Sequence, residues 1–365
     1  MGATYRVDTA HALKGEHAAL NLQHAQPEAF RAVRQTSTGS NTRPSSRPFT
    51  RDVASDADHE AVHRFLVTVF QEPGQAQFQH SINAPRYEPL DRLLMRLDDE
   101  IVAHVQLSHR TVYFGELALP TIDIKHLGTL PEYRHQGLAG DLLNAVENET
   151  NLHGALILTV RARLPEYFLQ QGWSPWLNFS RSSANPRALI SQLKLLKPPA
   201  PTSYLETAPP ELHVRLWRRN ELDSIRQLYA GQTSERFGAT SRDEADWQWL
   251  INGGSCDRIY VAVRETEQES YSPTTGEIVG YAVVRDSCVL ELVADGSTDA
   301  ARKLLVRVCA DAMETGRHCV EYHAPPDCPL HQVFRSADGT HSTENSQGGR
   351  QLLSKLLYPE QFLLK

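Results

Sequence analysis

Proline marks the main division of this chain. Five prolines lie between Lys194 and Glu211, and a segment so rich in proline cannot continue a helix or a central strand. On both sides of it the sequence predicts a similar order of strands and helices. Because 365 residues suffice for two domains, we expect one architecture used twice, with a linker at residues 197–210.

The elements of the first half, residues 48–196, follow from β-prone runs and from apolar residues at helical spacing. Short polar segments at Asp98–Glu100 and Ser108–Arg110 separate the β-prone runs, which predicts an antiparallel meander. The expected strands are Phe49–Val53, Leu93–Leu97, Ile101–Leu107, Thr111–Leu117, Ile122–Leu130 and Ala155–Val160, with helices around Val62–Phe70 and Leu138–Glu149. A strand, a helix and another strand in sequence require a crossover, so the sheet is mixed.

The second half, residues 211–338, predicts the same kind of sheet. Its expected strands are Leu212–Leu216, Arg258–Arg264, Glu277–Arg285, Val289–Val293 and Cys319–His323, and its helices are Glu221–Ser234, Asp243–Ile251 and Thr298–Gly316. Residues 339–365 add a polar loop and a final apolar strand, Leu352–Leu357. The predicted fold class is α/β (α+β), with two mixed, mostly antiparallel sheets flanked by helices.

Composition limits the partners and the location of the protein. Residues 1–47 are rich in Ala, Gln, His, Ser and Thr, which predicts a disordered arm. The formal net charge of −7 does not favour nucleic acid, and a cationic substrate suits it better than an anionic polymer. The five cysteines form no Cys-x-x-Cys pair, and no apolar run approaches 18 residues. We therefore expect a cytoplasmic protein with no bound metal and no membrane contact, whose oligomeric state the sequence does not give.

The most informative segment runs from His126 to Leu143. It predicts a strand that stops at Pro131, a loop, and a helix that starts at Gly137. The first N–H groups of a helix have no intrahelical acceptor and favour anions, so this start suits a pyrophosphate. It lacks the Gly-x-Gly-x-x-Gly of dinucleotide-binding proteins and the Gly-Lys-Ser/Thr of P-loops.

Two motifs resemble those of the Gcn5-related N-acetyltransferase (GNAT) superfamily. Arg134-x-x-Gly137-x-Ala139 resembles its Arg/Gln-x-x-Gly-x-Gly/Ala motif, and the run from Tyr167 to Trp173 resembles its Tyr-x-x-x-Gly-Phe motif. The resemblance covers roughly residues 49–194. It implies acetyl-CoA as co-substrate, with the coenzyme held mainly by backbone groups. The implied coenzyme-binding residues are Leu127, Gly128, Thr129, Arg134, His135, Gln136, Gly137, Leu138, Ala139 and Gly140.

The catalytic residues implied by the resemblance are less complete. Phe168 stands where the family usually has a tyrosine acid, so Tyr167, one residue earlier, is the candidate acid. Asp123 on the strand before the loop is the candidate base, with Glu116 and His126 as rivals. Arg161 is a candidate to hold a coenzyme phosphate or a substrate carboxylate, or is a solvated arginine.

The corresponding turn of the second half reads as a degenerate copy. Asp295 and Asp299 flank the expected helix start and would repel a pyrophosphate, so we expect this half to keep the fold without the cofactor and to wall the substrate cleft. A functional unit followed by a degenerate one is similar to the enhanced intracellular survival acetyltransferases. The chain stops at Lys365, where their sterol-carrier-like third domain would begin, so we expect that domain to be absent.

These features predict an N-acetyltransferase that moves the acetyl group of acetyl-CoA to a primary amine of a small molecule or a protein in a ternary complex. The alternative is a catalytically weak module that binds acyl-CoA, because Phe168 has no proton to give.

Overall fold

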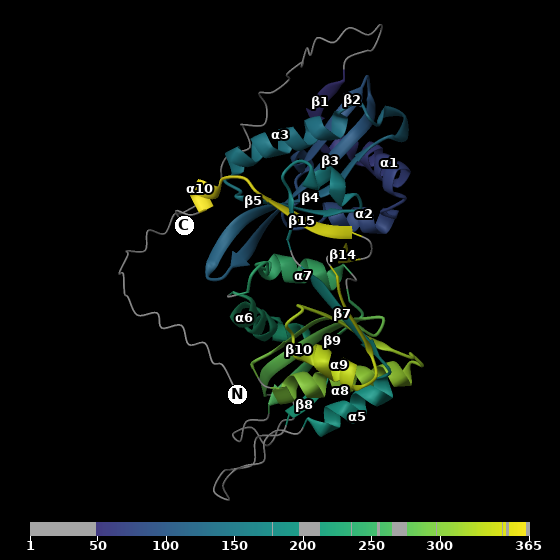
Figure 1. The fold of residues 1–365 in the computed structure, drawn as a ribbon, viewed down its shortest axis with the longest axis vertical. Helices are drawn as coiled ribbons and strands as arrows, with labels where there is room; N and C mark the ends of the chain where they lie inside the picture. Colours follow the sequence, from purple (N-terminus) through teal and green to yellow (C-terminus); the bar gives the residue numbers. More distant parts are fainter. Residues whose placement is uncertain are drawn as a thin grey trace, which may run out of the picture.

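The computed structural model describes residues 49–176, 178–196, 212–234, 236–253, 256–264, 276–296, 298–344, 346–347 and 350–362. Two of the expected segments, the arm at 1–47 and the linker at 197–210, lie outside the described residues. The described residues form two sheets, each with its own helices (Figure 1). We call each sheet with its helices a unit, the first unit being the one that contains residues 49–176.

The first sheet has eight strands and begins with the expected meander. Its order is β1 (Thr50–Val53), β2 (Arg92–Leu97), β3 (Glu100–Phe114), β4 (Leu117–Thr129), β5 (Ile157–Ala162), β15 (Arg350–Leu356) and β14 (Ser346–Gln347), with β6 (Ser174–Pro175) on β15. Its helices are η2 (Asp56–Asp58), α1 (His59–Phe70), α2 (Gln75–Ile82), η3 (Pro89–Asp91), η4 (Pro131–Tyr133), α3 (Leu138–His153) and α4 (Pro165–Leu169). Only β4 and β5 among these strands pair in parallel.

The second sheet has seven strands and repeats this plan. Its order is β13 (Thr340–Glu344), β7 (Phe179–Ala184), β12 (Val320–Ala324), β11 (Cys288–Ala294), β10 (Glu277–Arg285), β9 (Arg258–Arg264) and β8 (Leu212–Leu216). The remaining helices are α5 (Pro186–Leu195), η5 (Arg219–Glu221), α6 (Leu222–Thr233), α7 (Glu244–Asn252), α8 (Thr298–Glu314), α9 (Leu330–Ser336) and, near the end of the chain, α10 (Pro359–Phe362). The predicted fold class, two mixed sheets flanked by helices, is confirmed.

The two units exchange strands. β7, from the first half of the sequence, pairs with β12 and β13 of the second sheet, and β15, from the end of the chain, pairs with β5 of the first. Figure 1 shows the yellow β15 among the blue and teal strands of the first unit. The expected boundary near residue 196 therefore does not separate the sheets, because strand pairing is non-local and leaves no mark in a local pattern.

The meander also differs from its prediction between residues 108 and 121, where the expected gap at 118–121 lies inside β4. Ser108–Arg110 does not interrupt the sheet, because β3 continues through it to Phe114. The turn lies instead at Gly115, whose φ of +64° suits glycine. Ser108, His109 and Arg110 are partly exposed residues within a long strand rather than a loop.

Local sequence explains the start of α1. The Ser55 N–H and the Ser55 hydroxyl both donate to Asp58 Oδ2, at 2.9 and 2.8 Å, and so close the η2 turn that leads into α1. Val62, Phe65 and Leu66 then lie on one face of the helix and are buried in the core of the first unit. This core holds the sheet beside which the candidate site is built.

The units contact each other through α2, α7 and the end of β3. Arg86 forms ion pairs of 2.6 Å with Asp243 and with Asp246 at the start of α7. The Trp249 indole N–H donates to the His80 carbonyl at 3.1 Å, and the two rings stack at 4.4 Å. Together with the exchanged strands, these contacts tie the second unit to the first.

No helix in the described part of the chain is long and apolar enough to cross a membrane.

We predict that Leu353→Ala lowers the free energy of unfolding by about 2 to 5 kcal/mol. Leu353 comes from the end of the chain, yet it is fully buried in the core of the first unit. The measurement is urea denaturation followed by tryptophan fluorescence. Leu356→Ala on the same strand is the control, because Leu356 is 43% exposed. Equal effects of the two substitutions would contradict the buried position of β15.

Candidate functional site

The candidate site begins where β4 and β5 separate. These strands pair only from Thr121–Ile124 to Ile157–Val160. β5 pairs with β15 on its other edge from Ile157 to Ala162, while residues 125–129 of β4 pair, among the described residues, with β3 alone. The end of β4 therefore keeps one edge whose backbone groups are not used by another described strand.

A bulge shapes this end of β4. Gln106 lies opposite Lys125 and His104 opposite Gly128, so His126 and Leu127 together face a single residue of β3. His126 has a φ of +52°, and its carbonyl accepts a hydrogen bond of 3.0 Å from His104 Nδ1. The buried His104 thus holds the bulge in place.

The loop after β4 leads to an open helix start. Arg134 Nε donates to the Thr129 carbonyl at 3.3 Å, and Gly137, at φ +87°, is the N-cap of α3. No side chain caps this helix, and a Cβ added to Gly137 would meet nothing within 4 Å. His135, Gln136 and Gly137 are exposed. The first-turn amides are therefore free to bind an anion, which is what a pyrophosphate requires.

The other predicted coenzyme-binding residues have mixed environments. Leu138 is buried under the first turn of α3, whereas Ala139 and Gly140 are half-buried. Leu127 packs against the core, and Thr129 is buried. Gly128 has a packing role that the sequence did not reveal, because a Cβ there would lie 2.7 Å from the Phe70 ring of α1. The structure thus brings the predicted loop and strand end together.

Tyr167 and Phe168 differ in where their rings lie. Phe168 is buried and packs edge-on against Trp173. The Tyr167 hydroxyl faces α3 and lies 3.8 Å from where a Cβ of Gly140 would be. Of these two neighbours, Tyr167 therefore presents a polar group to the helix start.

The three candidate bases lie in very different places. Asp123 is 17% exposed and accepts a 3.0 Å hydrogen bond from the Thr159 hydroxyl. Glu116 is exposed at the β3–β4 turn, seven residues or roughly 23 Å along the strand from Asp123. Burial lowers the pKa of His126 to about 4, so this ring is neutral near pH 7. Asp123 is the candidate beside the end of the β4–β5 pairing.

Sequence reasoning missed the polar residues around Asp123. Arg110 Nε lies 3.9 Å from Asp123 Oδ2, and Lys125 Nζ donates to Ser108 Oγ at 3.1 Å. Burial, followed by the positive charge of Arg110, lowers the pKa of Lys125 to about 8. Polar residues at alternate positions of β3 and β4 could have indicated a polar face on these strands. The prediction of a turn at 108–110 prevented that interpretation.

The helix start of the second unit has different chemistry. Asp295 precedes α8 and forms a 2.8 Å ion pair with Arg264, and Asp299 in the first turn of α8 pairs with Arg302. Two carboxylates therefore stand where the first unit has an exposed glycine loop. The two carboxylates disfavour the binding of an anionic ligand at the start of α8.

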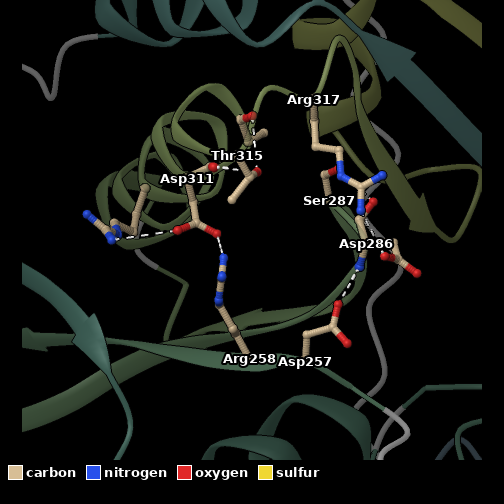
Figure 2. Close-up of polar contacts among 9 residues, drawn as sticks. Asp257, Arg258, Asp286, Ser287, Asp311, Thr315 and Arg317 are labelled. Atoms are coloured by element: carbon tan, nitrogen blue, oxygen red, sulfur yellow. Dashed lines mark hydrogen bonds and ion pairs between the residues drawn. The ribbon is translucent and has the colours of Figure 1, made fainter.

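The second unit also has a cavity of about 170 Å³ between α8 and the β10–β11 turn. Figure 2 shows its charged side chains turned toward one another rather than toward the open space. Asp311 forms an ion pair with Arg258, and Asp286 forms one of 3.1 Å with Arg317. These groups satisfy one another, so we assign the cavity no ligand.

One side-chain group in the second unit has metal-ligand chemistry. Cys288, Glu321 and His323 place one ligand atom each within 4.8 Å of the others, a grouping that their spacing along the chain does not reveal. Arg181 already donates to the Glu321 carboxylate, which gives that ligand a cationic partner. We therefore assign no metal to this group.

Comparison with known proteins agrees with this geometry. The family model of the acetyltransferase (GNAT) domain matches residues 51–176. None of the curated proteins matches the chain.

Several solved structures have a similar fold. A probable N-acyltransferase from Enterococcus faecalis V583 shares 10% identity at a TM-score of 0.67, covering 86% of this chain and 74% of its own. A GCN5-related N-acetyltransferase from Kribbella flavida shares 16% at 0.63, covering 84% and 71%. Eis1 from Mycobacterium abscessus shares 15% at 0.56, covering 87% and 75%.

These findings confirm the resemblance drawn from the two motifs. Residues 51–176 match the model of the acetyltransferase (GNAT) domain, and the two units together share their fold with solved structures described as N-acyltransferases or N-acetyltransferases.

Proposed function

We propose that the protein transfers the acetyl group of acetyl-CoA to a primary amine, with both substrates bound at once in the first unit. The observation that carries this proposal is the open start of α3 beside the unpaired edge of β4. A phosphate-bearing thioester needs an anion site and an extended backbone to lie along, and these two features supply both.

The coenzyme would be held mainly by backbone groups. The pantetheine arm of acetyl-CoA, which contains two amides, would lie along the backbone of Leu127, Gly128 and Thr129 at the free edge of β4. The backbone amides of residues 135–140 would bind the pyrophosphate. The left-handed Gly137 lets the chain turn into α3 without a side chain over these amides.

The reaction forms an N–C bond between amine and acetyl group and breaks the C–S bond of the thioester. The attacking amine must lose a proton, and the thiolate that leaves must gain one. We assign proton removal to Asp123, directly or through water, because it lies where β4 and β5 part. We assign the acid role to Tyr167, because its hydroxyl faces the first turn of α3.

A second candidate function is a module that binds acyl-CoA and turns over poorly. The burial of Phe168, at the position where the family usually has a tyrosine, favours it. In either case the proposed acceptor is a small-molecule or protein amine, without nucleic acid or membrane. The proposed location is the cytoplasm, with which five cysteines free of disulfides are compatible.

A coenzyme A release assay with a panel of primary amines separates the two functions. Steady release that depends on the amine supports the transferase. Tight binding of acetyl-CoA in calorimetry, without release above the rate of hydrolysis for any amine, supports the binding module. Absence of both would overturn the proposal.

We predict that Gly137→Glu weakens acetyl-CoA binding by about tenfold or more, because it places a negative charge among the first-turn amides. Calorimetric titration measures the change. Gly154→Glu is the matched control, because Gly154 is also left-handed with open space and lies at the other end of α3. If both variants bind equally well, α3 does not hold the pyrophosphate.

We predict that Tyr167→Phe lowers kcat by about tenfold or more at saturating amine, because the thiolate loses its proton donor. Binding of acetyl-CoA in calorimetry is expected to change less than kcat. Tyr358→Phe serves as control, since Tyr358 packs in a separate apolar cluster. A kcat equal to that of the wild type across the pH range would remove Tyr167 from the mechanism.

A further inference from the structure

Three neighbouring strands place polar side chains on one face of the first sheet. Ser108 lies opposite Asp123 in the antiparallel β3–β4 pair, and Asp123 lies beside Thr159 in the parallel β4–β5 pair. Residues two positions further along a strand share its face. The set formed in this way, which we call the polar cluster, is Ser108, Arg110, Asp123, Lys125, Thr159 and Arg161.

The polar cluster is organised around its one carboxylate. Asp123 accepts a hydrogen bond from Thr159 through one oxygen, and Arg110 approaches the other at 3.9 Å. This approach is too long for a hydrogen bond, and Arg110 Nε is buried without a hydrogen-bond partner among the described residues. The Arg110 side chain is 39% exposed, so the guanidinium can still reach a ligand.

Positive charge exceeds negative charge in the polar cluster. Arg110 and Lys125 contribute two cations against the single carboxylate of Asp123, and the charge of Arg161 lies near enough to act on Lys125. The pKa of Lys125 reflects this excess, since burial and the charges of Arg110, Arg92 and Arg161 lower it while Asp123 alone opposes them. An anionic ligand would reduce the repulsion among these cations.

Lys125 and Arg161 lie where β4 and β5 separate, and Arg110 lies opposite Thr121, on the other side of Asp123. Lys125 and Arg161 are the residues directly after Ile124 and Val160, the last pair that joins β4 to β5. The proposed pyrophosphate site is elsewhere, at the start of α3. The polar cluster is therefore available to the acceptor rather than required by the phosphates.

We propose that the acceptor amine also carries a carboxylate, as a free amino acid does. This inference rests on the proposed function. The ammonium group faces Asp123 and Thr159, and the carboxylate faces Arg110, with Lys125 on the other side of Asp123. Such an arrangement matches the two charges of a zwitterion, whereas the second ammonium of a polyamine would meet Arg110 or Lys125.

The acidity of the whole chain does not oppose this choice. The net charge of −7 is distributed over 365 residues, and exposed charges further away than about 10 Å are largely screened by salt. The charge within the polar cluster therefore decides which acceptor binds.

The test compares free amino acids with their carboxamides, for example phenylalanine with phenylalaninamide, in the coenzyme A release assay. We expect a higher kcat/KM for the acid, and we expect Arg110→Gln to lower the acid-to-amide ratio of kcat/KM by about tenfold or more. The intrinsic reactivity of the two amines is the same for every variant, so a change in the ratio reports recognition of the carboxylate.

Arg163→Gln is the matched control. Arg163 follows β5 but pairs with Glu72 rather than with the polar cluster, so its ratio should equal that of the wild type. A wild-type preference for polyamines over amino acids, or an acid-to-amide ratio that Arg110→Gln leaves at the wild-type value, would overturn the inference and leave the proposed function standing. Equal losses for acid and amide in Arg110→Gln would also overturn it, because the arginine would then act on the coenzyme or on folding.

A binding measurement keeps the inference testable if no amine is acetylated. Calorimetry of the protein with coenzyme A then compares phenylalanine with phenylalaninamide. Tighter binding of the acid, lost in Arg110→Gln, supports recognition of a carboxylate even though the transferase proposal has failed. Equal binding of both, or no binding of either, overturns it.

Discussion

The separation of β4 from β5 is the constraint on which the candidate site depends. Two parallel strands that stay paired leave no room between them, but these part after Ile124 and Val160. β15 pairs with the other edge of β5 from Ile157 to Ala162, so β5 remains part of the sheet where it leaves β4. The far end of the chain thus completes the sheet beside which the site in the first unit forms.

A series of buried hydrogen bonds fixes the bulge at the end of β4, next to this site. The fully buried Arg92 donates to the Tyr87 hydroxyl and to His104, which in turn donates to the carbonyl of His126 at the bulge. Burial lowers the pKa of both Arg92 and His104. Burying a guanidinium or an imidazole is costly unless it is hydrogen-bonded. These hydrogen bonds therefore fix the shape of the end of β4 rather than simply filling space.

The two units have the same architecture but different chemistry at matching helix starts. The first has an exposed glycine loop, whereas the second has Asp295 and Asp299, each paired with an arginine. The charges at a helix start can differ without changing a fold whose core is formed by apolar residues. Exchange of β7 and β15 then keeps the second unit attached to the first.

The sequence by itself determined most of the longer strands and helices and the start of α3, whereas α2, α5 and β7 were not predicted. Helical spacing, capping residues and Gly137 act within a few residues, so a local pattern is enough to predict them, and it is enough for the repeated order of elements as well. Only the tertiary structure decided that β15 joins β5, that Gly128 makes room for Phe70, and that Arg110, Asp123 and Arg161 share one face. These facts depend on register and pairing between residues far apart in the chain, and a local pattern carries no record of which distant strand will be its neighbour.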